Sequence, residues 1–356
     1  MNLKKLISIM AILITIILFN TGCSSPEILG GNHELDDSND KNLMVHFLDV
    51  GQADSILIQL PNGSTALIDG GNRADSQLVV DYIKRLKIQK IDYLIATHPH
   101  EDHIGGLPDV IKSFDILNVY MPKKSATTKI FEELVTEIKH KGIKATEGKG
   151  GIDILNEDGI KFSIIAPNSS DYIETNDYSI VTKLQYKDTS FIFTGDAEKP
   201  SEDEMIKKGY NLSANVLKVG HHGGRTSTSE VFLDEVNPKY AVISVEKGND
   251  YGHPHKETIE RLEKKGINIL RTDEMGTIVL VSDGTNTSIK GIDSTKISKE
   301  EDTKENMIKY IGNKNTKVYH STDCNSLPNK ENQVIFESTE DAEEEGYKPH
   351  STCINK

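Results

Sequence analysis

Short apolar runs alternate with amphipathic stretches from residue 42 onward, and turn-forming Gly, Pro, Asn and Asp separate them. The runs predict strands at residues 44–50, 54–60, 65–68, 91–96, 116–121, 161–167, 190–194 and 240–245. Apolar stripes at helical spacing predict helices at residues 75–87, 107–114, 127–141, 199–208 and 257–265. Residues 267–283 are expected to close the fold as a last hairpin. This mixture of strands and helices predicts an α/β fold.

The N-terminus carries a pattern of its own. Lys4-Lys5 precedes an apolar stretch at residues 6–19 that is short for a membrane-spanning helix, which needs about 20 residues. Gly22-Cys23 resembles a bacterial lipobox, which implies a signal peptide at residues 1–23 and lipidation of Cys23. An ordinary signal or a single anchor is the alternative. Residues 24–41 are polar and Gly-containing, and we expect a flexible linker there. The body is therefore expected on the extracellular face of the membrane, lipid-anchored or else secreted.

Composition limits the function classes. The 356 residues are 36% hydrophobic, with a mean hydropathy of −0.44, which excludes a multispan membrane protein. The formal net charge of −14 excludes attraction of nucleic acid to the surface as a whole. A phosphate polymer would have to be held by metal ions and a local basic patch.

Candidate chemistry is concentrated in His98-Pro99-His100-Glu101-Asp102-His103, directly after the predicted strand at residues 91–96. Imidazole and carboxylate are the ligands that zinc and similar cations accept. Extended backbone would point His98 and His100 the same way. The pattern therefore predicts a metal site with His98, His100, Asp102 and His103 as ligands.

This H-x-H-x-D-H motif resembles that of the metallo-β-lactamase superfamily, which implies two metals in an αββα sandwich over residues 42–283. Residues 47–55 and 67–71 resemble the extracellular domain of ComEC-type competence proteins, with Ala53 where that family usually has Gly. The resemblance implies that Asp69 orients the ligands by hydrogen bonds.

Further ligands are expected after later strands. Asp196 follows a strand and Gly195, where a carboxylate can bridge two cations, and the resemblance implies that role. His221, the first histidine after the strand that ends near Val219, is expected to complete the second metal site with Asp102 and His103. His222 is expected to contact substrate oxygen or to act as a general acid.

One superfamily histidine is missing, because this chain has Asn176-Asp177-Tyr178-Ser179 at its place. Asn176 and Asp177 are either weak ligands or, with Ser179, neighbours that support the ligands. The thinner set of protein ligands on the first metal leaves zinc and manganese open. His253 is expected at the rim of the site, reaching substrate or serving only the structure.

The C-terminal segment carries a second set of metal-ligand residue types. After a polar linker at residues 284–306, His320-x3-Cys324 and His350-x2-Cys353 supply four ligands for a tetrahedral zinc. Residues 307–356 resemble the small zinc-binding domain of Ada, with two histidines in place of cysteines. A Cys324–Cys353 disulfide is the alternative outside the cell.

The first functional hypothesis is a surface-anchored, metal-dependent phosphodiesterase. The resemblance to ComEC and the Ada-like C-terminal segment imply that its substrate is DNA. Two cations lower the pKa of a shared water toward neutrality, with Asp102, His222 and His253 as further catalytic residues. The ligand types also suit hydrolysis of a cell-wall ester or small molecule. A different class is a DNA-binding lipoprotein without catalysis, or one that docks a membrane partner.

Overall fold

The computed structural model describes residues 42–293, 310–322, 324, 326–336, 339–351 and 353–354. The predicted signal peptide, its Cys23 and the linker at residues 24–41 lie outside the described residues. Among the helices that the structure describes, none has the length and apolar character needed to cross a bilayer.

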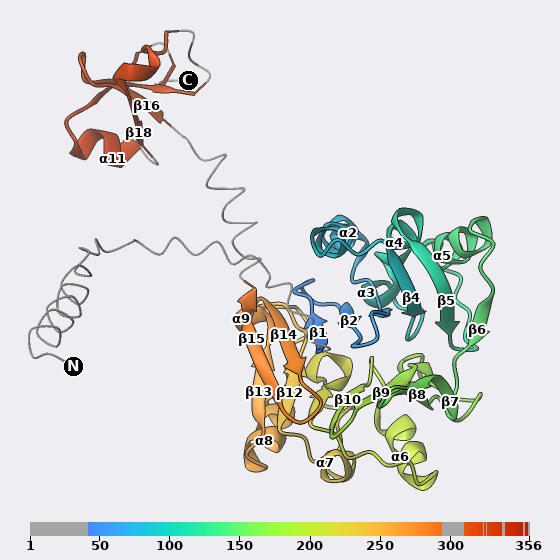
Figure 1. Ribbon diagram of the computed structural model, residues 1–356. Coiled ribbons are helices and arrows are strands. Elements are labelled where there is room, and N and C mark those ends of the chain that lie inside the picture. The colour runs from blue at the N-terminus through green and yellow to red at the C-terminus, as the bar shows by residue number, and fades with distance from the viewer. Residues whose placement is uncertain are drawn as a thin grey trace, which may run out of the picture. The chain divides into compact units, whose positions relative to one another are not determined.

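Two sheets form the body (Figure 1). The first has the order β15-β14-β1-β2-β3-β4-β5-β6, with bounds Thr287–Asp293, Thr277–Ser282, Leu43–Phe47, Ile56–Gln59, Thr65–Ile68, Lys90–Ile95, Asp115–Met121 and Ala145–Glu147. The second has the order β13-β12-β11-β10-β9-β8-β7, with bounds Asn268–Arg271, Tyr240–Ile243, Val216–Lys218, Thr189–Phe193, Val181–Tyr186, Ile160–Ala166 and Ile152–Glu157.

Helices cover the outer face of each sheet (Figure 1). Those on the first sheet are α2 (Ser76–Arg85), α3 (Glu101–Ile104), α4 (Leu107–Ser113) and α5 (Lys129–His140). Those on the second sheet are α6 (Lys199–Lys207), α7 (Glu230–Val236) and α8 (Lys256–Lys264). The predicted αββα sandwich is confirmed.

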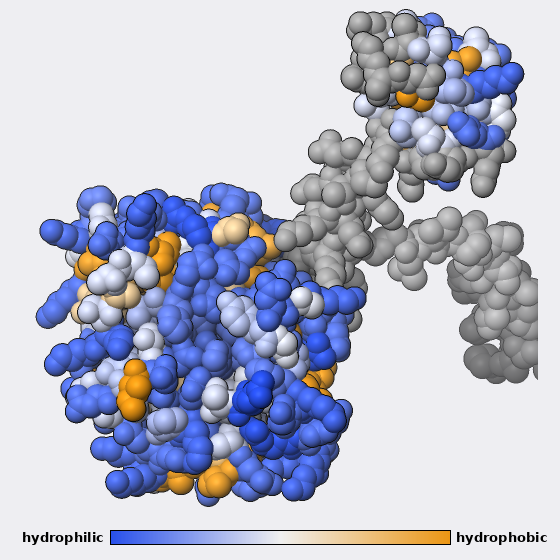
Figure 2. Space-filling model, turned by 180° about the vertical axis from the view of Figure 1, so that it is seen from behind, coloured by the Kyte–Doolittle hydropathy of each residue, from blue (hydrophilic) through white to orange (hydrophobic). Residues whose placement is uncertain are grey.

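The period of two along each strand divides the apolar residues between layers. In β2, Ile56 and Ile58 pack into the core between the sheets, whereas Leu57 packs under the helices of the first sheet. The face in Figure 2 is mostly hydrophilic, with scattered hydrophobic side chains. The apolar side chains of the body are mostly buried in three cores, which stabilise the sandwich by the hydrophobic effect.

Parallel pairing decides where the site lies. Strands β3, β4, β5 and β6 pair in parallel, so they end at one edge of the first sheet. In the second sheet, β10, β11, β12 and β13 are also parallel. The loops after β4, β10 and β11 carry the motifs that the sequence singled out.

Two expectations about the end of the body are wrong. Residues 267–283 do not form a hairpin, because β13 pairs with β12 in one sheet and β14 pairs with β1 in the other. The short helix α9 (Thr272–Met275) and Gly276, with a φ of 71°, carry the chain across the sandwich. The hairpin partner of β14 is β15, which lies inside the stretch expected to be a linker from residue 284. The exposed polar residues of β15 are typical of an edge strand, and they gave the segment the composition of a linker, so its sequence did not predict a strand.

The C-terminal segment forms a four-stranded sheet in the order β18-β16-β17-β19, with bounds Gln333–Phe336, Tyr310–Asn313, Val318–Ser321 and Lys348–Pro349. Helix α11 (Thr339–Glu344) packs on it. The small core holds Tyr319, Phe336, Ala342 and Tyr347. A core of this size supplies little stability by itself, so a domain this small needs a bound metal or a disulfide as well.

Candidate metal centre

The H-x-H-x-D-H motif follows β4 and therefore lies at the edge of the sandwich. His98 is buried, and its Nδ1 lies 3.1 Å from Oγ1 of Thr97 and 3.2 Å from Oγ of Ser179. On the other side of the ring, Nε2 lies 3.0 Å from Nδ1 of His100 and 3.9 Å from Oδ2 of Asp196. The structure therefore brings His98, His100 and Asp196 together, as expected for the first metal.

Asp69 holds the H-x-H-x-D-H segment in place through contacts with Thr97 and His103. It is fully buried at the end of β3, where its φ is 59°. Its Oδ1 accepts a hydrogen bond from the Thr97 amide at 2.8 Å, and its Oδ2 accepts one from the Thr97 hydroxyl at 2.7 Å. Oδ2 also lies 2.7 Å from Nδ1 of His103. An Nδ1–H held by a carboxylate leaves Nε2 of His103 as the nitrogen that can bind a cation.

A second group forms around that nitrogen. Ligand atoms of Asp102, His103, Asp196 and His222 all lie within 4.8 Å of one another. Nε2 of His103 is 3.2 Å from Oδ1 of Asp196 and 3.7 Å from Oδ2 of Asp102. Among the described residues, neither Nε2 of His103 nor Oδ1 of Asp196 has a well-aligned hydrogen-bond partner, although both are buried. Such atoms are costly unless something else binds them, so the donor set fits a cation.

The expectation that His221 is the metal ligand and His222 is not is wrong, because their positions are exchanged. His222 is buried, with Nε2 3.2 Å from Oδ2 of Asp102 and 3.7 Å from Oδ1 of Asp196. His221 instead places Nδ1 3.0 Å from Oε1 of Glu198, away from the four-residue group. Both residues have positive φ, 48° and 53°, so the backbone turns sharply and directs the two rings differently. The second histidine takes the position expected for the first.

The loop that lacks the superfamily histidine surrounds the first site. Oγ of Ser179 accepts a hydrogen bond from the Asp196 amide at 3.1 Å, so Ser179 supports both His98 and Asp196. Oδ1 of Asp177 accepts from the amides of Glu198 and Ser201 at the start of α6. Asp177 therefore caps the start of α6. It is not among the described residues whose ligand atoms converge, so the structure does not support its role as a ligand. Asn176 donates to Oε1 of Glu198 at 3.2 Å.

His253 lies at the rim, as expected. Its ring centroid is 5.2 Å from that of His221 and 6.4 Å from that of His222. Its Nδ1 is 3.2 Å from Nε2 of Gln52. Burial and the neighbouring histidines lower the pKa of His253 to about 4, so its imidazole is neutral at pH 7.

Burial and neighbouring charges shift the pKa values of the residues in the metal centre. Burial opposes ionisation of His103 and Asp196, but the surrounding opposite charges outweigh it together: Asp196, Asp102 and Asp69 act on His103, and His103 and His222 act on Asp196. The pKa of His103 therefore lies well above its ordinary value, and the pKa of Asp196 lies well below. Burial lowers the pKa of His98 far below its usual range, so that ring is neutral. Anionic Asp196 and neutral His98 are the forms that bind a cation, whereas His103 has to release a proton when a cation binds to its Nε2.

Sequence reasoning missed an ion pair behind the centre. Lys218, at the end of β11, is completely buried, and its Nζ lies 2.8 Å from Oδ2 of Asp54. Oδ1 of Asp54 is 3.6 Å from Nδ1 of His222, and that nitrogen is 3.0 Å from the Ser244 carbonyl. The sequence pattern places Asp54 and Lys218 in predicted strands and assigns them no further role. The one available signal was a lysine inside an apolar strand.

The C-terminal segment holds a separate group. Atoms of His320, Cys324, His350 and Cys353 lie within 4.8 Å of one another. Nδ1 of His320 is 3.4 Å from Sγ of Cys324, and Nδ1 of His350 is 3.2 Å from Sγ of Cys353. Two thiols and two imidazoles that converge in this way fit a closed tetrahedral zinc site, and they favour that expectation over a disulfide.

Comparison with known proteins agrees with both parts. Residues 48–246 match the family model of the metallo-beta-lactamase superfamily, and residues 295–355 match the metal binding domain of Ada. The chain is 32% identical over 251 residues to ComE operon protein 3 of Bacillus subtilis (strain 168), covering 66% of this chain and 32% of that protein. It is 30% identical over 239 residues to competence protein ComA of Neisseria gonorrhoeae, covering 65% and 31%.

The alignments span about a third of the length of these relatives. Among solved structures, Igni18, a metallo hydrolase from Ignicoccus hospitalis, is 15% identical, with a TM-score of 0.45 and coverage of 67% of this chain and 98% of that one. The chain belongs to the metallo-β-lactamase superfamily of hydrolases, is related to ComEC-type competence proteins, and carries an Ada-like metal-binding domain at its C-terminus.

Proposed function

We propose that this hydrolase is a metal-dependent phosphodiesterase that cleaves DNA. The observation that carries the proposal is the convergence of Asp102, His103, Asp196 and His222, with two buried polar atoms left for a cation. The relationship to two competence proteins supports a phosphodiester substrate. Lipidation of Cys23 and a place on the outer face of the membrane belong to the same proposal.

Two sets of residues would hold two divalent cations, zinc or manganese. His98, His100 and Asp196 would hold one, while Asp102, His103, Asp196 and His222 would hold the other. Bound there, the cations would supply an activated water and positive charge for the phosphate oxygens. The oxygen and nitrogen ligands suit either metal.

The chain's own residues prepare the site for this chemistry. Asp69 fixes the ring of His103, and Ser179 fixes His98 together with the Asp196 backbone. Neutral His253 at the rim can exchange a hydrogen bond with a substrate oxygen without adding charge. The pKa of His221 shifts the other way: burial lowers it, but the hydrogen bond to Glu198 and the negative charges of Asp196 and Glu198 together outweigh burial and raise the pKa above its ordinary value. A protonated His221 would be a proton donor to the leaving oxygen.

An assay tests the proposal. Purified residues 24–356 are incubated with plasmid DNA, a lactam and bis(p-nitrophenyl) phosphate, with and without manganese or zinc. We expect metal-dependent cleavage of the plasmid and of the phosphodiester, lost in His100→Ala. The matched control is His140→Ala, a solvent-exposed histidine at the end of α5, which should cleave as the wild type does.

The net charge of −14 favours one alternative, hydrolysis of a cell-wall ester or a small molecule. Turnover of small esters without cleavage of plasmid would support this alternative and overturn the DNase proposal. Metal binding without turnover of any substrate would favour a DNA-binding module.

A further inference from the structure

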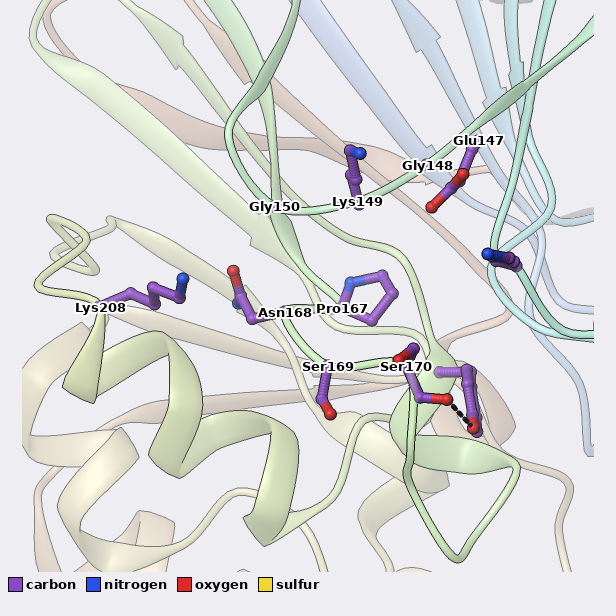
Figure 3. Close-up of a pocket in the computed structure, with 11 residues that line it drawn as sticks. Glu147, Gly148, Lys149, Gly150, Pro167, Asn168, Ser169, Ser170 and Lys208 are labelled. Carbon is purple, nitrogen blue, oxygen red and sulfur yellow. Dashed lines mark hydrogen bonds between the residues drawn. The ribbon is translucent and has the colours of Figure 1, made fainter.

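A pocket of about 350 Å³ opens beside the metal centre, and the residues that line it are rich in lysine (Figure 3). Three lysines, Lys123, Lys149 and Lys208, line it together with one carboxylate, Glu147. Asn168 adds an amide, and Figure 3 shows Lys208 extending from the end of α6 toward it. A net positive pocket in a chain of charge −14 marks a place where an anion can bind.

The sheet places this pocket close to the metal centre. Strands β4, β5 and β6 are parallel neighbours, so their C-terminal ends lie side by side. His98 follows β4, Lys123 follows β5 and Lys149 follows β6. Neighbouring strands are about 4.8 Å apart, so the two strand spacings from β4 to β6 amount to roughly 10 Å.

The two sites also share a wall. Tyr178 lines the pocket and is buried, and the next residue, Ser179, lies 3.2 Å from Nδ1 of His98. Both belong to the segment around η2 (Asn176–Tyr178). A chain molecule that crosses this segment would contact the pocket and the metal centre at once.

The pocket is built into the fold. The Gly150 amide donates to the Pro167 carbonyl at 2.9 Å, which ties the loop after β6 to the end of β8. A Cβ at Gly150 would lie 2.2 Å from Oδ1 of Asn168, and one at Gly148 would lie 2.3 Å from Cδ1 of Ile180. The loop that carries Lys149 therefore lies directly against the ends of β8 and β9 in the second sheet.

We propose that this pocket binds the phosphodiester backbone of a nucleic-acid strand at roughly 10 Å from the metal centre, the separation that two strand spacings give. Lysine is suited to phosphate as a point charge. Nδ2 of Asn168 donates one hydrogen to the Ile165 carbonyl at 2.7 Å and has a second N–H for a phosphate oxygen. The inference rests on the proposed function, because it assigns this pocket to the same substrate. It also answers the objection from net charge, since the basic residues are needed only along one path.

Binding of a short fluorescein-labelled oligothymidylate to the full chain, loaded with manganese, tests the inference at several salt concentrations. The test variant is Lys149→Gln/Lys208→Gln, and the control is Lys84→Gln/Lys264→Gln on the exposed faces of α2 and α8. We expect the test variant to lose about tenfold in affinity, and its slope of log affinity against log salt to shrink by about 1.4, or 0.7 for each lost contact. The control should match the wild type.

Turnover of bis(p-nitrophenyl) phosphate separates the pocket from the metal centre, because this substrate has a single phosphate and therefore no second one for the lysines of the pocket. Its kcat/KM should be unchanged in the test variant. If the wild type binds the oligonucleotide through the lysines but does not cleave it, the inference stands and the DNase proposal fails. The inference is overturned if the test variant binds like the control, or if inorganic phosphate at equal phosphate concentration displaces the oligonucleotide completely.

Discussion

His222 and Asp102 lie 120 residues apart in the chain, and Nε2 of His222 is 3.2 Å from Oδ2 of Asp102. Asp102 lies in α3, which follows β4 of the first sheet, and His222 lies in the turn that follows β11 of the second. The contact thus joins the two sheets at the edge where their parallel strands end. It also defines which of the two adjacent histidines belongs to the metal centre.

Replacing Asp69 with asparagine should weaken metal binding without unfolding the protein. The amide would place an N–H opposite Nδ1 of His103, which favours the wrong tautomer of the ring. We expect the affinity for manganese or zinc to fall by about 10- to 100-fold. Metal titration followed by calorimetry measures it, with Asp81→Asn on the exposed face of α2 as the control. Equal affinities in the two variants would refute the orienting role of Asp69.

The buried pair of Lys218 and Asp54 should be costly to break from one side. Lys218→Met leaves the Asp54 carboxylate buried beside His222, and we expect a loss of about 3 to 5 kcal/mol in the free energy of unfolding. The double variant Lys218→Met/Asp54→Leu should lose less, because no uncompensated charge remains. Urea denaturation of the metal-free proteins measures both. A double variant less stable than Lys218→Met would contradict the account.

Glu202 should make stability depend on pH. Burial raises the pKa of Glu202 to about 7, above its ordinary 4.5, although the amides of Ser229 and Thr228 donate to it. Because the folded-state pKa is the higher one, the contribution of Glu202 is fully present below pH 4.5 and is lost as pH rises through 7. The free energy of unfolding of the wild type relative to Glu202→Gln should fall by about 2 to 3 kcal/mol between pH 5 and 8. A difference independent of pH would show that the carboxyl keeps its ordinary pKa.

The C-terminal domain should need zinc to fold. Its core is small, and the four ligand atoms converge on one point, so metal binding would supply folding free energy. We expect one tightly held zinc, and a thermal transition that disappears with a chelator. Cys353→Ser should abolish both. Intact mass under non-reducing conditions gives the decisive contrary result, which would be loss of two hydrogens from a Cys324–Cys353 disulfide.

Local patterns were enough to predict most strands and helices and the first metal ligands, whereas the αββα sandwich was implied by the resemblance to the metallo-β-lactamase superfamily. H-x-H-x-D-H follows a strand and spans only six residues, so its convergence depends on one loop. Asp196 and Asp69 also follow strands directly, which fixes them at the same edge. These positions depend on strand ends and on little else.

The remainder depends on tertiary contacts that leave no local trace. His221 and His222 are chemically identical neighbours, and only two left-handed backbone conformations decide which ring faces Asp196. Strand β15 is polar because one of its neighbours is solvent, so its pattern is typical of a linker. Lys218 is buried only because Asp54, from a distant strand end, compensates its charge.

Metal content and turnover of three proteins, the wild type, His222→Ala and His221→Ala, test the central claim most directly. Inductively coupled plasma mass spectrometry and hydrolysis of bis(p-nitrophenyl) phosphate are measured on the same samples. The structure predicts that His222→Ala loses about one metal equivalent from the body and at least 100-fold in kcat, whereas His221→Ala keeps its metals. Loss of metal in His221→Ala with full metal content in His222→Ala would contradict the account.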